Sequence, residues 1–214
     1  MAHVSASITK FRDMRHFKMN ENSNFPLSYK NIILRPMCEN DLVDEERWST
    51  VEVEWQEWDA PWEEDEPFDM EEEREMLLKK LANPPRVYGT LEIDTDDGQH
   101  IGGVNRYFID RQKDLLAVGI AIPPITARRK GYGKNAFILW IAYLFSNGPF
   151  EEIYTQTWSG NYPMIKLAES IGFEEIGRIK GIRRVRGERY DALTFSLSRK
   201  CFYERFEDMQ LGRK

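Results

Sequence analysis

After a polar opening, the pattern of apolar residues predicts one strand and then a helix. Residues 1–28 are polar and lack a regular apolar period, so we interpret them as an N-terminal extension. The short apolar run Asn31–Arg35 is typical of a strand. Asn40 or Asp41 can cap a helix that continues through Trp48. The folded domain is therefore expected to begin near residue 29.

A second helix follows, and two prolines end it. Asp69 and Glu72 form a capping pair at its start. Pro84 and Pro85 cannot continue a helix, since proline lacks the backbone donor and fixes φ. Between these limits the apolar residues recur at helical spacing, at Met70, Leu77, Leu78 and Leu81.

The middle of the chain changes to the period of strands. Val87–Ile93 is a first apolar run, and the turn signal Asp96-Asp97-Gly98 follows it. Ile101–Ile109 is a second strand, and the charged residues Asp110–Asp114 form a turn. Leu115–Ile122 is a third strand, which ends at two prolines. We expect these three strands to form an antiparallel meander.

The second half of the chain alternates between helices and strands. Phe137–Phe145 is apolar nearly all round, as expected of a helix that is covered on most sides. Glu152–Trp158 alternates like a strand, Pro163–Ile171 suits a helix, and two strands follow near Glu175–Ile182 and Tyr190–Leu197. This order predicts an α+β or mixed α/β fold, in which helices cover a central sheet.

Composition fits one domain of ordinary size. The chain has 214 residues, of which 41% are hydrophobic, and we place the domain at residues 29–199 with a C-terminal tail at 200–214. The net charge is −6, which argues against nucleic acid as a partner, because phosphate neutralisation needs Lys and Arg. An acidic protein is better suited to cationic partners such as polyamines, amino sugars or basic peptides.

Other features favour a cytoplasmic protein without a metal. No apolar signal core opens the chain, and no stretch approaches the roughly 20 apolar residues of a membrane span. Cys38 and Cys201 are far apart and show no zinc-ligand spacing. We interpret the three scattered histidines as ordinary surface residues: His3, His16 and His100.

One loop carries the pattern of an anion site. Gly131-Tyr132-Gly133 lies between a predicted strand and a predicted helix, where glycines allow close approach to a ligand. The helix start offers unpaired N–H groups and a positive dipole end, which suit a pyrophosphate. The positive charges of the loop come from Arg128, Arg129, Lys130 and Lys134.

Two other interpretations of this loop remain. The loop can be a surface turn that happens to be basic. Gly131-x-Gly133-x-x-Ala136 also matches the dinucleotide fingerprint of an oxidoreductase. That fingerprint belongs early in a βαβ unit, with an acidic residue about 20 positions further on, at the end of the next strand. Here antiparallel strands come first, and Glu151 and Glu152 stand at the start of the next strand.

The order and spacing of five short motifs resemble the GNAT superfamily of acyl-CoA N-acyltransferases. Its central motif is Arg/Gln-x-x-Gly-x-Gly/Ala at the start of a long helix, and the resemblance runs from about residue 31 to residue 197. The pattern is most similar to the branch of ribosomal-protein alanine and spermidine acetyltransferases. The matching segments are Ile101–Gly103, Gly119–Ile122, Arg128–Gly133, Asn161–Ile165 with Ile171–Phe173, and Gly187–Asp191.

The resemblance implies a sheet of about seven strands, splayed between the fourth and the fifth, with acetyl-CoA in the splay. Ala121 and Ile122 would then bind the pantetheine amides, as an added strand would. The backbone from Arg129 to Lys134, including Lys130, Gly131, Tyr132 and Gly133, would bind the pyrophosphate, and Arg128 opens the same motif. Asn161 resembles the asparagine near the pantetheine arm. An amine would attack the thioester directly, and N–H groups near Ile122 would stabilise the oxyanion.

The chain departs from that family at the acid and the base. Val118 stands near the place of a glutamate that many relatives carry, Ala168 replaces a tyrosine, and Met164 replaces a serine. Amine attack needs a neutral amine, so a base or a water path is expected. The catalytic groups are therefore unknown, with Glu54, Glu57 and Asp59 as candidate bases and Tyr162 as a candidate acid.

Residues 52–75 are strongly acidic and carry three tryptophans. In the family this region helps to form the acceptor pocket. Carboxylates beside indole faces suit a cation, through charge pairing and cation–π contact. A solvated acidic face with core-packed tryptophans is the alternative. The residues expected to bind substrate are Trp55, Glu57, Trp58 and Asp59.

We therefore expect an N-acetyltransferase that acts on a cationic primary amine with acetyl-CoA as co-substrate. The alternative from another class is a non-catalytic acyl-CoA-binding or regulatory module, which the missing glutamate and tyrosine favour. No nucleic acid, membrane or metal is expected as a partner. A homodimer is one option for assembly, since this family often dimerises through strands or C-terminal segments.

Overall fold

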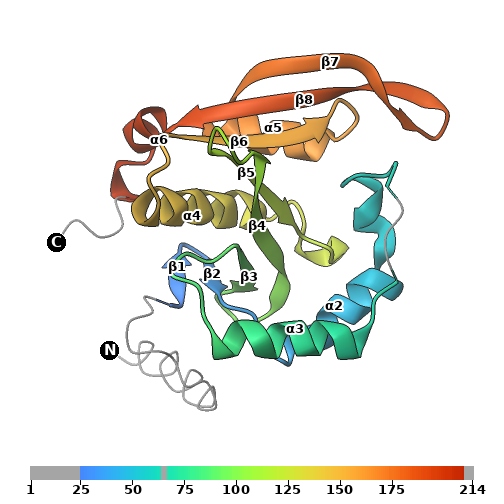
Figure 1. The fold of residues 1–214 in the computed structure, drawn as a ribbon, viewed down its shortest axis with the longest axis vertical. Helices are drawn as coiled ribbons and strands as arrows, with labels where there is room; N and C mark the ends of the chain where they lie inside the picture. Colours follow the sequence, from blue (N-terminus) through green and yellow to red (C-terminus); the bar gives the residue numbers. More distant parts are fainter. Residues whose placement is uncertain (1–24, 64–66, 210–214) are drawn as a thin grey trace.

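A mixed sheet lies at the centre of the part of the chain that the computed structural model describes, residues 25–63 and 67–209 (Figure 1). Within those residues the sheet has eight strands in the order β1-β2-β3-β4-β5-β6-β8-β7. Every neighbouring pair is antiparallel except β5 and β6. The strands are β1 (Leu27–Tyr29), β2 (Ile32–Arg35), β3 (Thr90–Thr95), β4 (His100–Asp110), β5 (Leu115–Ala121), β6 (Glu152–Trp158), β7 (Glu174–Val185) and β8 (Glu188–Ser198).

Four of the five α-helices of the described residues occur in the predicted order, and the fifth, after the last strand, was not predicted. Two precede the meander, two alternate with the later strands, and one follows the last strand. Short 3₁₀ turns connect some of them, among them Val53–Glu57. The α-helices of the described residues are α2 (Asp41–Thr50), α3 (Met70–Ala82), α4 (Tyr132–Asn147), α5 (Tyr162–Ile171) and α6 (Arg199–Arg205). The α+β fold with helices on a central sheet is confirmed.

Helix α4 forms the centre of the hydrophobic core. Ten consecutive residues, Ala136–Phe145, are buried, as the apolar run predicted. Each large side chain buried here contributes about 1.5–3 kcal/mol. The indole N–H of Trp140 donates to the Asn105 carbonyl at 3.0 Å, which joins the helix to β4. This packing fixes the position of the helix start, where the glycine loop lies.

The two faces of the sheet differ in chemistry. Ile32, Leu34, Leu91 and Ile93 point into the core that α4 shares. The alternate side chains of β3 point to the opposite face, where Glu92 lies within reach of His100 on β4. Helix α2 lies on that second face, since its Asp44 also contacts His100. One face is therefore apolar, and the other is polar and charged.

The ends of the domain contain more ordered structure than the sequence pattern predicted. Phe25 packs in the core and β1 pairs with β2, so the boundary placed after residue 28 falls inside a strand. The sheet consequently has one strand more than the seven that the resemblance implies. Phe202 of α6 is buried in the same core. Residues 1–24 and 210–214, the remainder of the expected extension and tail, lie outside the described residues.

One strand begins later than its apolar pattern predicts. The run Val87–Ile93 suggested a start at residue 87, but β3 begins at Thr90. The backbone N–H of Tyr88 donates to the Tyr143 hydroxyl at 2.9 Å instead of pairing with a neighbouring strand. A side chain of α4 thus satisfies the backbone group that a longer strand would have used.

Candidate active site

Strands β5 and β6 meet at one point and then separate. They run parallel, and a single register pair joins Ala117 to Tyr154. One residue further on, the Thr155 hydroxyl donates to the Val118 carbonyl at 2.9 Å. No other register pair joins the two strands in the described part of the chain. The edge of β5 is therefore unpaired toward β6 along Gly119–Ala121.

The pleat of β5 decides which backbone groups face this gap. Successive carbonyls of a strand point to opposite sides, and the Val118 carbonyl faces β6, so those of Ile120 and Ile122 face the same way. The Ala121 carbonyl faces β4, where a Cβ on Gly102 would lie only 2.2 Å from it. Of the two residues expected to bind pantetheine, the register therefore favours Ile122, and it favours Ile120 over Ala121.

At one end of the gap lies the glycine loop, at the start of α4. Gly131 has a φ of 84°, and no side chain caps the helix. The first N–H groups of the helix, those of Tyr132, Gly133 and Lys134, have no acceptor within the helix. A Cβ on Gly131 would meet nothing within 4 Å, so the space in front of these donors is open. This arrangement has the free donors that an anion site for phosphate groups requires.

The basic residues around this loop divide into two groups. Arg129, Lys130 and Lys134 are exposed. Arg128 instead turns back, and its guanidinium donates to the carbonyls of Ile122 at 2.9 Å and Pro123 at 2.7 Å. The same guanidinium forms an ion pair with Glu54. Arg128 therefore braces the end of β5, and the three exposed residues supply the mobile positive charge.

Asn161 lies at the far wall of the gap, between β6 and α5. It is buried, and its carbonyl oxygen accepts a hydrogen bond from the Met164 N–H at 3.0 Å, which caps α5. Its amide donates to the Trp58 carbonyl at 2.6 Å, and the Trp158 indole donates to the same carbonyl at 3.0 Å. Asn161 was predicted at the end of this strand, near the pantetheine arm, and in the structure its amide is engaged by the chain that crosses the gap.

That crossing chain is the acidic segment, residues 53–62. Its Glu54 pairs with Arg128 on the β5 side, and its Trp58 carbonyl is held on the β6 side. Two further contacts reach the β7–β8 hairpin: Glu57 pairs with Arg186 at 2.6 Å, and the Arg183 guanidinium lies 4.2 Å from the Trp62 ring centre. The segment thus spans the gap and contacts both of its walls.

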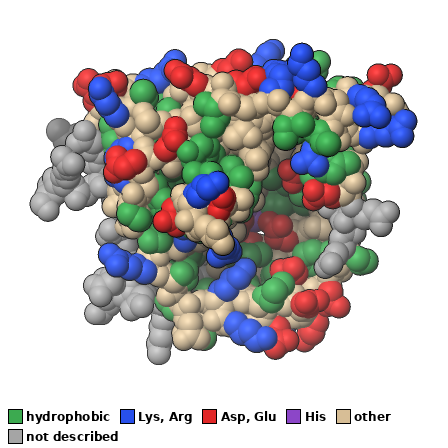
Figure 2. Space-filling model, turned by 45° about the horizontal axis from the view of Figure 1, so that its top comes forward, with side chains coloured by type: hydrophobic (Ala, Val, Ile, Leu, Met, Phe, Trp, Pro, Cys, Tyr) green, Lys and Arg blue, Asp and Glu red, His purple; other side chains and the backbone are tan. Residues whose placement is uncertain are grey.

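The acidic segment combines exposed carboxylates with half-buried indoles. Glu57 and Asp59 are exposed, while Trp55 and Trp58 are half-buried. A pocket of about 260 Å³ lies on the segment, lined by Trp55, Gln56, Asp59, Ala60, Pro61 and Glu63. Figure 2 shows a hollow in the molecular surface, with acidic side chains in its depth and on its rim. This composition suits a cationic ligand.

The other candidate acids and bases are less well placed. Hydrogen bonds from the Trp58 indole and then from Arg128 hold the pKa of Glu54 below its usual range, so Glu54 accepts protons poorly. Glu57 already carries the ion pair with Arg186. Tyr162, the first residue of α5, is 64% exposed and points to solvent. None of these three side chains is buried enough for desolvation to bring its pKa into the range that proton transfer needs.

A model of the acetyltransferase (GNAT) domain matches residues 31–174, more than half of the chain. The chain belongs to the GNAT acetyltransferase family. It is 26% identical over 130 residues to the SPbeta prophage-derived uncharacterized N-acetyltransferase YokL of Bacillus subtilis strain 168, a match that covers 60% of this chain and 71% of that protein.

Solved structures share the fold at low sequence identity. Ribosomal-protein-S5-alanine acetyltransferase from Vibrio fischeri superposes with a TM-score of 0.65 at 18% identity, over 82% of this chain and 97% of the other. Spermidine N-acetyltransferase from Vibrio cholerae, in complex with CoA and spermine, gives 0.65 at 17% identity, over 80% and 98%. The GNAT fold accounts for the antiparallel strands before the glycine loop, which a dinucleotide-binding βαβ unit would not have.

The three positions at which the resemblance places an acid or a base are all occupied by packing side chains. Val118 is 1% exposed and packs in the core, and Ala168 is fully buried. Met164 packs against the same core. The three side chains contribute to packing, so proton transfer has to come from elsewhere in the site.

A buried polar cluster, which the sequence reasoning missed, lies on the charged face of the sheet. The interpretation of His100 as a surface residue is wrong, because its side chain is 7% exposed. One ring nitrogen lies 3.0 Å from an Asp44 oxygen, and the other lies 3.1 Å from a Glu92 oxygen. Glu45 stands one helical turn after the buried Asp41, so helical spacing was the available signal for it.

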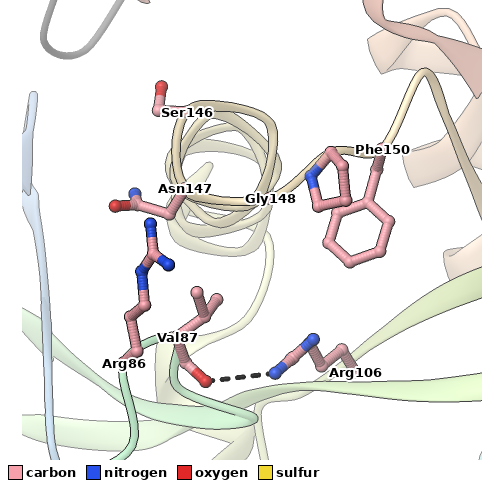
Figure 3. Close-up of a pocket in the computed structure, with 8 residues that line it drawn as sticks. Arg86, Val87, Arg106, Ser146, Asn147, Gly148 and Phe150 are labelled. Carbon is pink, nitrogen blue, oxygen red and sulfur yellow. Dashed lines mark hydrogen bonds between the residues drawn. The ribbon is translucent and has the colours of Figure 1, made fainter.

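Another pocket lies away from the gap, at the C-terminal end of α4 (Figure 3). It has a volume of about 510 Å³ and two arginines in its lining, Arg86 and Arg106. Arg106 donates to the carbonyls of Tyr88 and Val87, both at 3.0 Å, and so braces the backbone. A helix of 16 residues is about 24 Å long, which separates this pocket from the glycine loop.

None of the helices in the described residues is both long enough and apolar enough to cross a membrane.

Proposed function

We propose that this GNAT enzyme transfers an acetyl group from acetyl-CoA to a primary amine on a cationic acceptor. The observation that carries the proposal is the gap between β5 and β6, with an anion-binding helix start at one end and the acidic segment across it. The first feature suits a polyanionic cofactor, and the second suits a cation. A polyamine, an amino sugar or a peptide N-terminus meets the second requirement.

The residues of the β5 wall fit a CoA thioester. The N–H groups of Tyr132, Gly133 and Lys134 would bind the pyrophosphate, with exposed Arg129 and Lys130 beside them. The unpaired β5 edge would bind the pantetheine amides as an added strand does. The Ile120 carbonyl and the Ile122 N–H are the groups that face the gap. Bound acetyl-CoA supplies an activated acetyl thioester.

The residues of the opposite wall would bring the amine to that thioester. The acidic segment would attract and orient the cation, and holding two reactants in line contributes about 7–11 kcal/mol in favourable cases. The Ile122 N–H would stabilise the oxyanion that forms on the thioester carbonyl. The structure of a spermidine acetyltransferase with CoA and spermine supports an acceptor of this charge.

The test is CoA release measured with a thiol reagent. The full chain is incubated with acetyl-CoA and, separately, spermidine, glucosamine or an alanine-initiated tripeptide. Release above the amine-free rate with at least one of these amines is the expected result, together with acetylated amine by mass spectrometry.

Thermal unfolding with acetyl-CoA, NADH and ATP provides the control for the cofactor. A ligand at 100 times its dissociation constant stabilises the folded state by about 2.7 kcal/mol. We expect stabilisation by acetyl-CoA alone. Stabilisation by acetyl-CoA without release from any amine would contradict the acceptor class, and stabilisation by NADH alone would contradict the cofactor.

A further inference from the structure

The buried cluster on the charged face of the sheet includes Glu45, whose carboxylate makes no hydrogen bond with the residues that the structure describes. One oxygen of Glu45, one oxygen of Glu92 and one ring nitrogen of His100 all lie within 4.8 Å of one another. Glu92 and His100 hydrogen-bond to each other. Glu45 makes no hydrogen bond or ion pair within the part of the chain that the structure describes, and its side chain remains partly exposed.

The strand register places this cluster beside the unpaired edge of β5. Glu92 on β3 pairs with Gly103 on β4, and Gly103 pairs with Ala121 on β5. At about 4.8 Å per strand, the Glu92 backbone lies about 10 Å from Ala121. The Glu92 carboxylate leans over Gly103, where a Cβ would lie 3.4 Å from its oxygen. The Glu92 carboxylate therefore lies about one strand away from the edge expected to hold the thioester, and a Glu45 oxygen lies within 4.8 Å of a Glu92 oxygen.

The surface between the cluster and that edge is built from small residues, and the Asn105 side chain lies over part of it, since a Cβ on Gly119 would be 2.6 Å from its oxygen. This face of β4 and β5 carries the small residues Gly103, Gly119 and Ala121. They alternate along the strands with the core residues Val104 and Val118. Asn105, the next residue on this face of β4, is exposed. An amine can therefore approach the edge of β5 over Gly103 and Ala121, between the Glu92 carboxylate and the Asn105 side chain.

The charges around Glu45 favour proton exchange near neutral pH. Burial, and next the charge of Glu92, raise the pKa of Glu45 to about 7. The groups that face it are Asp41 and Asp44 on α2, Glu92 on β3 and His100 on β4. Further out, Arg35 on β2 is shared between Asp41 and Asp94, and Arg47 pairs with Asp44, so neither arginine neutralises Glu45.

The same three groups offer an incomplete set of ligands for a metal ion. Both ring nitrogens of His100 are already engaged, one by Asp44 and the other by Glu92. A metal ion would have to displace the hydrogen bond to Glu92. The cluster instead matches a proton-accepting carboxylate whose neighbours are fixed in place.

We propose that Glu45 is the general base that deprotonates the acceptor amine, in place of the glutamate that many relatives carry near Val118. This inference rests on the proposed function. The carboxylate takes one proton from the ammonium group and becomes a carboxylic acid. The neutral amine then forms a bond to the thioester carbon, the C–S bond breaks, CoA leaves as a thiolate, and the nitrogen loses its second proton to water.

The test compares Glu45→Gln with Glu46→Gln, a matched change at the next, exposed residue of the same helix. The readout is kcat/KM for CoA release with the most active of the three amines above, measured from pH 6 to pH 10. Removing a general base typically costs 10²–10⁴-fold, so we expect a loss of about 100-fold at pH 7 for Glu45→Gln and none for Glu46→Gln.

The pH profile separates this role from a structural one. Glu45 has to be ionised to accept a proton, so wild-type activity should fall as the pH drops below about 7. Glu45→Gln should lose this limb and recover toward wild type near pH 10, where a much larger fraction of the amine is neutral on its own than at pH 7. Glu45→Asp should retain part of the activity. The affinity for acetyl-CoA and the melting temperature should not fall.

The outcomes distinguish a failure of the Glu45 inference from a failure of the proposed function. Wild-type release that is unchanged in Glu45→Gln across the pH range would overturn the inference and leave the proposed function intact. A loss in Glu45→Gln that is equal at pH 7 and pH 10, or is matched by weaker acetyl-CoA binding, would also overturn it. No amine-dependent release by the wild type would overturn the proposed function and the inference with it.

Discussion

The two walls of the gap are built from different parts of the chain and by different means. The cofactor wall uses backbone N–H groups and exposed basic side chains from one short run, Arg128–Lys134. What we call the acceptor wall combines, under the proposal, the acidic segment with the buried cluster of α2, β3 and β4, which lies beside the β5 edge. Cofactor binding at the first wall would tolerate many side chains, but a side chain at its glycines would occupy the space of the phosphates. Acceptor binding at the second wall would depend on each individual side chain.

This difference separates the part of the site that sets the cofactor from the part that sets the acceptor. A pyrophosphate site made of backbone donors binds the same cofactor in any member of the fold that keeps the loop. Acceptor recognition rests on side chains, which can change without disturbing the core. The buried polar cluster is the exception on the acceptor wall, since it is also part of the packing under α2.

The largest effect is expected on the cofactor wall, from Gly131→Asp. The change places a negative charge and a side chain where the phosphates have to approach, so acetyl-CoA affinity should fall on the order of 100-fold or more by calorimetry. Gly98→Asp is the matched control, because Gly98 has a φ of 86°, close to the 84° of Gly131, and also has nothing near a Cβ. Unchanged affinity in Gly131→Asp would remove the loop from the site.

On the other wall, His100 should make stability depend on pH. Burial alone lowers the pKa of His100, but the hydrogen bond to Glu92 and the charges of Asp41 and Glu92 outweigh it and raise that pKa to about 9. The folded chain thus holds a proton that the unfolded chain releases near 6.5. The stabilisation is complete below pH 6.5 and is lost as the pH rises through 9.

Melting temperatures of wild type and His100→Gln across that range measure this effect. A loss of 1 kcal/mol lowers the melting temperature by about 2–4 °C in a chain of this size, and we expect a fall of that order in the wild type between pH 6.5 and pH 9.5. His100→Gln should show a flatter profile. Parallel profiles for the two proteins would contradict a charged His100 in the cluster.

The sequence was informative about the cofactor wall because its signal is local. Gly131-x-Gly133 and the basic residues around it are adjacent in the chain, so spacing alone predicted a loop at the start of a helix, and the structure has that helix start at Tyr132. The phase of the β5 pleat was not visible from the sequence, since it depends on pairing with β4 and β6. This explains why Ala121 was chosen where the register favours Ile120.

The acceptor wall was only partly predictable, because its contacts span long distances in the chain. Composition pointed to the acidic segment, but Asn161 meets Trp58 across 103 residues. His100 and Asp44 are 56 residues apart, and no pattern near His100 marks it as buried. Burial of a polar residue is decided by the partner that satisfies it, and that partner is set by the fold.

A smaller effect is expected from the double change Glu57→Gln with Asp59→Asn. It removes two exposed negative charges from the acidic segment, and exposed charges contribute little each. We expect the Michaelis constant for a cationic acceptor to rise several-fold, with acetyl-CoA binding unchanged. An unaltered constant would mean that this part of the segment is only a solvated face.

The smallest effect is expected from Glu54→Gln, at the contact that joins the two walls. The ion pair with Arg128 is largely exposed on the glutamate side, and such pairs contribute about 0–1 kcal/mol. Arg128 keeps its bonds to Ile122 and Pro123. Steady-state kinetics should change less than about fivefold. A much larger loss would show that the acidic segment and the cofactor loop act as one unit.

The most direct test of the account is a crystal structure of the protein with CoA. We expect the pyrophosphate at the N–H groups of Tyr132–Lys134 and the pantetheine arm along the β5 edge, in the gap between β5 and β6. CoA bound elsewhere, for example between Arg86 and Phe150 at the far end of α4, with the gap closed by the acidic segment, would contradict it.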